Sequence, residues 1–107
     1  MSALERLAAT IRARRNADGD MSYTRQLLDA GVARCARKFG EEAVELVVAA
    51  VAEDKAALTG EAADTFYHLL VLLEAREISL EEVFAELDRR AGTSGVAEKA
   101  ARGSDGS

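Results

Sequence analysis

The sequence predicts an all-α fold, and three observations support this prediction. The 107 residues include no proline and few aromatic side chains, and alanine, leucine, glutamate and arginine, which favour helices, dominate. Capping patterns recur along the chain, and apolar residues between them repeat at helical spacing. A chain this short has a modest core, so we expect a helical hairpin that forms a four-helix-type bundle together with a second subunit in a homodimer.

Each of the first two predicted helices begins after a serine that can cap it. Ser2 and Glu5 form a capping-box pattern that opens a helix ending near residue 16. Ser22 precedes a short second helix, and Gly31 closes that helix.

Two long helices form the predicted spine. The first runs from about Val32 to Glu53, and the second runs from about Lys55 to Arg76 after a cap at Asp54. The apolar face of the first helix consists of valines, namely Val44, Val47, Val48 and Val51. The buried stripe predicted for the second helix consists of Leu58, Ala62, Phe66, Leu69, Leu70 and Leu73.

The C-terminal part divides into a helix, a basic segment and a short tail. Ser79 opens a second capping-box pattern, and the helix that follows ends at Gly92. Residues 1–92 make up the predicted domain, and residues 93–102 are a basic segment of the same domain. Residues 103–107, which are glycine, serine and aspartate, are predicted to be disordered.

Composition and charge exclude several classes of protein. A net charge of −5 argues against general binding to nucleic acid, and no apolar run approaches the ~20 residues that cross a bilayer. The charged N-terminus lacks the pattern of a secretory signal, and Cys35 has no partner for an internal disulfide or a zinc site. We therefore expect a cytoplasmic protein that binds neither membranes nor nucleic acid.

Four carboxylates on the two long helices form the candidate site. Glu42 and Glu45 share one helix face, and Glu61 and Asp64 repeat the same spacing on the next helix. An antiparallel hairpin that reverses near residues 53–54 places Glu45 opposite Glu61 and Glu42 opposite Asp64. Four converging carboxylates raise one another's pKa unless a cation lies among them. Mg²⁺, with Mn²⁺ as a possible substitute, fits this set of oxygen ligands.

Two further residues extend the carboxylate row in one direction. Lys38 lies one turn before Glu42, and His68 lies one turn after Asp64. In the antiparallel hairpin both fall at the same end of the row, where they suit a phosphate chain. A di-iron carboxylate bundle fits poorly because it needs Glu-x-x-His pairs, whereas the chain has one histidine. A non-catalytic interaction protein with a solvated acidic face stays open as an alternative.

The same motifs resemble those of the all-α NTP pyrophosphatase (MazG-like) superfamily. The resemblance rests on Lys38-x-Gly40-Glu41-Glu42-x-x-Glu45, followed by Glu61-x-x-Asp64. Within the superfamily, the chain is similar to the phosphoribosyl-ATP pyrophosphatase family. Three stretches carry this narrower similarity, and they lie within residues 22–31, 64–70 and 90–102.

This resemblance implies Mg²⁺-dependent hydrolysis of phosphoribosyl-ATP to phosphoribosyl-AMP and pyrophosphate, the second step of histidine biosynthesis. It implies a metal site made of Glu42, Glu45, Glu61 and Asp64. It implies catalytic roles for Glu41, Glu42 and Glu45, with Glu41 either orienting a neighbour or acting as a base through water. It implies substrate contacts from Lys38, Tyr67, His68, Arg90, Ser94, Lys99 and Arg102. The nearest alternative is a housecleaning pyrophosphatase for free nucleoside triphosphates, and the basic segment favours the first activity.

Overall fold

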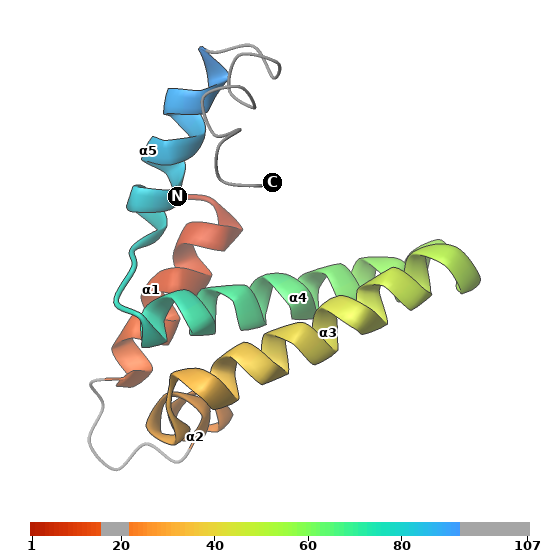
Figure 1. Ribbon diagram of the computed structural model, residues 1–107, viewed down its shortest axis with the longest axis horizontal. Helices are drawn as coiled ribbons and strands as arrows, with labels where there is room; N and C mark the ends of the chain where they lie inside the picture. Colours follow the sequence, from red (N-terminus) through yellow and green to blue (C-terminus); the bar gives the residue numbers. More distant parts are fainter. Residues whose placement is uncertain (16–21, 93–107) are drawn as a thin grey trace, which may run out of the picture.

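The computed structural model describes residues 1–15 and 22–92, and within these ranges every regular element is a helix. This confirms the predicted all-α class, and the helix ends agree with the predicted ones within about a residue where they are described. The predictions for residues 93–102 and 103–107 lie outside the described part of the chain. The helices are α1 (Ala3–Arg15), α2 (Tyr23–Ala30), α3 (Val32–Ala52), α4 (Lys55–Ala75) and α5 (Leu80–Ala91) (Figure 1).

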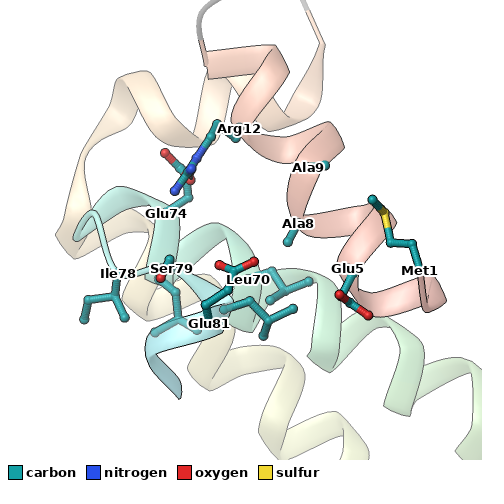
Figure 2. Close-up of a pocket in the computed structure, with 12 residues that line it drawn as sticks. Met1, Glu5, Ala8, Ala9, Arg12, Leu70, Glu74, Ile78, Ser79 and Glu81 are labelled. Atoms are coloured by element: carbon teal, nitrogen blue, oxygen red, sulfur yellow. Dashed lines mark hydrogen bonds and ion pairs between the residues drawn. The ribbon is translucent and has the colours of Figure 1, made fainter. Parts of the chain in front are cut away.

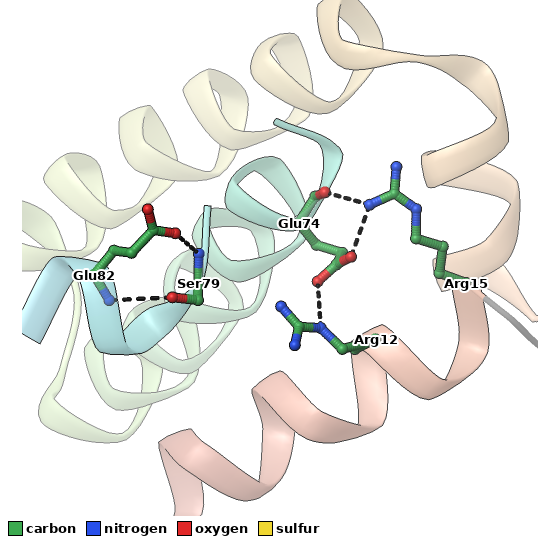
Figure 3. Close-up of polar contacts among 5 residues, drawn as sticks. All are labelled: Arg12, Arg15, Glu74, Ser79 and Glu82. Atoms are coloured by element: carbon green, nitrogen blue, oxygen red, sulfur yellow. Dashed lines mark hydrogen bonds and ion pairs between the residues drawn. The ribbon is translucent and has the colours of Figure 1, made fainter. Parts of the chain in front are cut away.

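The predicted caps are present. The Ser2 hydroxyl accepts a hydrogen bond from the Glu5 N–H at 3.1 Å, and the Glu5 carboxylate accepts one from the Ser2 N–H. Ser79 and Glu82 form the same reciprocal pair at the start of α5 (Figure 3). The Asp54 carboxylate caps α4 in the same way as the serines. These side chains satisfy backbone N–H groups that have no partner within their own helix.

Helices α3 and α4 form a long antiparallel hairpin, which is the spine of the molecule (Figure 1). The Thr65 hydroxyl donates to the Glu61 carbonyl within α4 at 2.8 Å and also lies 3.4 Å from the Glu42 carbonyl across the hairpin, so Glu42 lies level with the turn of α4 that contains residues 64–65. This is the register that the sequence predicts. Gly31 joins α2 to α3 at a φ of 100°, a backbone conformation that favours glycine.

The core lies at one end of this hairpin, where α1 and α2 pack against it. Its buried members are Ile11, Leu27, Cys35, Leu70, Val71 and Leu80. Cys35 fills this core as a small apolar side chain, and its thiol donates to the Leu27 carbonyl at 3.2 Å. Burial raises the pKa of the Cys35 thiol, which agrees with a structural role and low reactivity.

The end of the hairpin near the α3–α4 turn is not covered by any other described helix (Figure 1). The four valines of α3 that were predicted as its apolar face are 51% to 84% exposed. The prediction of a buried stripe on α4 is wrong at Phe66, which is 52% exposed, although Leu70 is buried. The reason is that α1 and α2 pack against the opposite end of the hairpin and leave this apolar surface without a cover.

An arginine pair fixes the C-terminal end of α1 to the C-terminal end of α4 (Figure 3). The Arg15 guanidinium donates to the Glu74 carbonyl at 2.6 Å and to the Glu74 carboxylate at 2.7 Å. Arg12 approaches the other carboxylate oxygen of Glu74 at 3.5 Å. The Glu74 side chain is 12% exposed, so these contacts are shielded from water more than ordinary surface ion pairs.

We expect Arg15→Met to lower the free energy of unfolding by roughly 1–2 kcal/mol, because two charge-assisted hydrogen bonds are lost and Glu74 keeps Arg12 as a partner. The measurement is urea denaturation followed by circular dichroism. Arg14→Met is the matched control, since Arg14 is exposed on the same turn of α1. Equal stability of the two variants would contradict this role for the arginine pair.

Candidate active site

Three carboxylates gather at the middle of the α3–α4 hairpin. Glu42, Glu45 and Glu61 each offer an oxygen atom, and these three atoms lie within 4.8 Å of one another. Glu42 and Glu61 are half-buried between the helices, whereas Glu45 is exposed. The cluster therefore has carboxylates from both helices and is open to solvent on the side of Glu45.

The electrostatics of the cluster are unfavourable in the absence of a cation. Burial, and then the neighbouring carboxylates of Glu45, Asp64 and Glu61, raise the pKa of Glu42. Burial, followed by the charges of Glu45 and Asp64, raises the pKa of Glu61. Asp64 is exposed and lies outside the group of three, yet its charge reaches both of these carboxyls.

One oxygen of the cluster lacks a partner. Glu61 Oε2 is buried and accepts no hydrogen bond from the described residues. Leaving a buried acceptor without a partner costs free energy, and leaving a charged one costs more. Converging carboxylate oxygens with one such orphan match the hard oxygen ligands that Mg²⁺ and Mn²⁺ prefer. The residues present therefore fit a divalent cation.

Lys38 and His68 lie at the same end of the carboxylate row, as the sequence predicts. His68 Nε2 is 3.9 Å from Glu42 Oε1, and the charge of Lys38 is near enough to lower the pKa of His68. Burial is the larger cause of that lowering, since His68 is only 6% exposed. Both causes favour the neutral imidazole, which sits beside one fixed positive charge.

Two other predicted site residues occupy different surroundings. Glu41 is exposed and forms an ion pair with Lys38 at 3.6 Å, outside the group of three carboxylates. Tyr67 shares a hydrogen bond of 2.5 Å with the Thr24 hydroxyl of α2. Thr24 is not among the residues that the sequence predicts for the site, because nothing in the sequence alone shows that α2 packs across α4 at this level.

Of the basic site residues predicted C-terminal to the hairpin, Arg90 lies in the described chain, and it is not brought to the cluster. Arg90 lies on α5, which extends away from the hairpin, and its guanidinium contacts Glu86 at 3.0 Å (Figure 1). Arg89 also contacts Glu86, and hydrogen bonds from the two arginines lower the pKa of Glu86 to about 2. The other predicted substrate contacts, Ser94, Lys99 and Arg102, lie outside the described residues.

A cavity of about 250 Å³ lies elsewhere, between α1, the C-terminal half of α4 and the start of α5 (Figure 2). Ala8, Leu70 and Leu80 line its apolar side, and Glu5 and Glu81 lie at its polar side. It contains none of the predicted site residues, so the candidate chemistry stays with the carboxylate cluster on the hairpin.

The match to a family model assigns the chain to the all-α NTP pyrophosphatase superfamily, and the helical hairpin with carboxylates from both helices agrees with this class. The sequence model described as phosphoribosyl-ATP pyrophosphohydrolase matches residues 4–91, and the chain belongs to that family. This confirms the resemblance stated from the motifs. Within the described residues, none of the helices is both long and apolar enough to span a membrane.

Several similar proteins carry the name phosphoribosyl-ATP pyrophosphatase. The protein of that name from Rhodobacter capsulatus is 63% identical over 96% of this chain and 100% of its own length. The one from Cereibacter sphaeroides is 62% identical over 96% of this chain and 100% of its own length. The one from Dinoroseobacter shibae is 60% identical over 95% of this chain and 100% of its own length.

Proposed function

We propose that this chain hydrolyses phosphoribosyl-ATP to phosphoribosyl-AMP and pyrophosphate in histidine biosynthesis, with Mg²⁺ as cofactor. The observation that carries the proposal is the cluster of Glu42, Glu45 and Glu61 on the hairpin that the family model covers. Relatives that align over their whole length bear the name of this activity, which supports the choice of substrate.

The proposed ligands of the cation are the four carboxylates that the sequence singled out, namely Glu42, Glu45, Glu61 and Asp64. When bound, Mg²⁺ or Mn²⁺ would neutralise charge on the phosphate oxygens and polarise the phosphoanhydride. Glu45 is an exposed carboxylate beside the half-buried Glu42 and Glu61, so it can accept a proton from the attacking water. Glu41 is a second candidate for that proton, or an orienting group.

The proposed contacts with substrate begin at the Lys38 and His68 end of the row. The Lys38 ammonium can leave its ion pair with Glu41 and bind a phosphate oxygen instead. The neutral His68 imidazole can donate one hydrogen bond to the phosphates. We keep Tyr67, Arg90, Ser94, Lys99 and Arg102 as proposed substrate-binding residues on the strength of the family resemblance alone.

We also propose that the chain works as a homodimer. The valines of α3 form one exposed apolar helix face, and Phe66 of α4 is a further large apolar side chain that the described residues leave exposed. The hairpin is a two-helix unit, and a second hairpin packed on this stripe would build the expected four-helix bundle. A cytoplasmic site of action likewise stays a prediction.

Val47→Asp should convert the dimer to a monomer, because it places a charge at the centre of the proposed apolar interface. Analytical ultracentrifugation at micromolar concentration measures the mass. Arg34→Asp provides the control, since Arg34 is exposed near the other end of α3, roughly 20 Å along the helix axis from Val47 at about 1.5 Å per residue. A wild-type chain that sediments as a monomer would refute the dimer outright.

The activity is tested by measuring pyrophosphate release from phosphoribosyl-ATP with Mg²⁺ and then with EDTA, beside ATP and a panel of dNTPs. The proposal expects fast release from phosphoribosyl-ATP that EDTA abolishes. Preferred turnover of dNTPs would assign the chain to the housecleaning branch instead. A folded protein that is silent on every substrate would favour the non-catalytic interaction protein.

A further inference from the structure

The single histidine of the chain is held in unusual surroundings for a residue on a charged stripe. His68 is 6% exposed, and its Nδ1 is buried without a hydrogen-bond partner among the described residues. Its other nitrogen, Nε2, lies toward Glu42 at 3.9 Å. No direct hydrogen bond from a neighbour therefore fixes which way the ring faces.

The absence of a partner at Nδ1 indicates where the proton of the neutral ring lies. A buried N–H without an acceptor is rarer and more costly than a buried acceptor without a donor. A proton on Nε2 points instead toward the negative field of Glu42. The favoured tautomer therefore carries its proton on Nε2, the atom that faces the carboxylate cluster.

Aromatic contacts, rather than hydrogen bonds, restrict the orientation of the His68 imidazole. The Tyr67 ring meets the imidazole edge-on, with ring centres 4.9 Å apart and planes at 79°. The Tyr23 ring of α2 meets it edge-on as well, at 6.1 Å and 87°. The two tyrosine rings lie nearly parallel to each other, at 20°. Edge-to-face contacts of this kind have directional preferences, so together they restrict rotation of the imidazole.

A pair of hydroxyl groups fixes the tyrosine in turn. Thr24 is 7% exposed in the first turn of α2, and its hydroxyl is 2.5 Å from that of Tyr67. Ser22 caps α2 through the Arg25 N–H, which sets the point where the helix begins and therefore the direction of Thr24. The pair spans 43 residues of sequence and joins α2 to α4 directly beside His68.

We propose that Thr24 and Tyr67 are positioning residues that act through His68: their paired hydroxyls, with the ring of Tyr23, hold the imidazole so that Nε2–H faces Glu42 and the phosphates of the substrate. The proposal rests on the proposed pyrophosphatase activity for its kinetic consequence. It gives the short helix α2, which contributes no carboxylate, a function at the site. It gives Tyr67 this positioning role in place of the substrate contact that the family resemblance implies.

The test removes one oxygen at a time. Tyr67→Phe keeps the ring and loses the hydroxyl. Thr24→Val keeps the branched shape and loses the hydroxyl, whereas Thr24→Ser keeps the hydroxyl and loses only the methyl group. Thr10→Val is the matched control, because the exposed Thr10 hydroxyl bonds within α1, far from the cluster. If Thr24→Val does not fold by circular dichroism, Tyr67→Phe carries the test by itself.

The first measurement needs no substrate. Long-range ¹H–¹⁵N spectra at pH 8 report the tautomer of His68 without assignment, since the chain has one histidine. The wild type should show a protonated Nε2 and an unprotonated Nδ1. Tyr67→Phe and Thr24→Val should move both ¹⁵N shifts toward each other as the tautomers mix, and Thr24→Ser and Thr10→Val should keep the wild-type shifts.

The second measurement is kinetic, at saturating Mg²⁺. Tyr67→Phe and Thr24→Val should each lower kcat about tenfold, as loss of an orienting partner does, with KM changed less than about twofold. The double variant should be no slower than the slower single variant, because the two hydroxyls act as one unit. Thr24→Ser should recover most of the wild-type kcat.

Each outcome decides the matter. Unchanged ¹⁵N shifts in both deletion variants, or a wild-type proton on Nδ1, would overturn the proposal. Altered shifts with unchanged kcat would overturn it too, because the imidazole would then move without consequence for the reaction. If the wild type hydrolyses no phosphoribosyl-ATP, the proposed function fails, while the spectra still decide whether the hydroxyl pair holds the ring.

Discussion

The Glu42→Gln, Glu61→Gln double variant should fold and lose about 100-fold or more of the wild-type turnover, measured as pyrophosphate release at saturating Mg²⁺. These two carboxylates are half-buried members of the cluster, and changes even to the partners of metal ligands cost about 10- to 100-fold. Glutamine keeps the shape of both side chains, so the hairpin should pack as before. Retention of more than about a tenth of the turnover would contradict the proposed ligand set.

The same double variant should be more stable than the wild type in metal-free buffer at pH 7. The pKa of each carboxyl is raised above its ordinary value of 4.5, so the folded state binds these protons more tightly than the unfolded chain. Folding stability therefore falls as pH rises from 4.5 through the raised pKa values, and this loss is the penalty that the ionised carboxylates impose. Glutamine, which carries no charge, therefore stabilises the chain at pH 7. It has little effect at pH 4, where the two carboxyls are already largely protonated.

Urea denaturation with EDTA at pH 7 and at pH 4 measures this difference. The control is the Glu77→Gln, Glu81→Gln variant, which removes the same charge from two exposed glutamates outside the cluster. A stabilisation of equal size in the control would show that general relief of the net charge of −5, and not the cluster, is responsible.

Mg²⁺ should stabilise the wild-type chain and have little effect on the double variant. A ligand that binds the folded state alone adds roughly 2.7 kcal/mol when its concentration is 100 times Kd. The converging carboxylates and the orphan oxygen of Glu61 are the features that a cation would satisfy. Thermal denaturation with increasing MgCl₂, with NaCl at matched ionic strength as control, measures the effect.

This stabilisation should weaken as the solution is acidified. The cation must displace protons from Glu42 and Glu61, and their raised pKa values place that competition above the ordinary carboxyl value of 4.5. Binding should therefore release protons, which calorimetry in two buffers of different ionisation enthalpy detects. A Mg²⁺ effect that is equally large in the double variant would place the metal site elsewhere.

The local structure was predictable because its causes are local. Ser2, Asp54 and Ser79 cap their helices through side chains that reach only three residues along the chain. The register of the hairpin was predictable for a similar reason: a short turn after residue 52 leaves two long helices a single way to run antiparallel. That register brought Glu42, Glu45 and Glu61 together as expected.

The sequence predicted burial less well where an apolar helix face could be covered either by the same chain or by a second one. Phe66 and the valines of α3 have the spacing of buried residues, but α1 and α2 cover the other end of the hairpin and leave them exposed. Periodicity states that a face is apolar; it does not state whether the same chain or another one covers it. Arg90 illustrates the same limit for charge, since α5 carries it away from the cluster.

The sequence by itself therefore determined the helices, the hairpin and the carboxylate row, because each depends on spacing within one or two neighbouring elements. Only the tertiary structure decided which residues from distant parts of the chain come into contact with the hairpin. The contact between Thr24 and Tyr67 joins residues 43 apart, and the link between Arg15 and Glu74 joins residues 59 apart. Such contacts depend on how short helices dock against the hairpin, and docking is the result of packing the whole core at once.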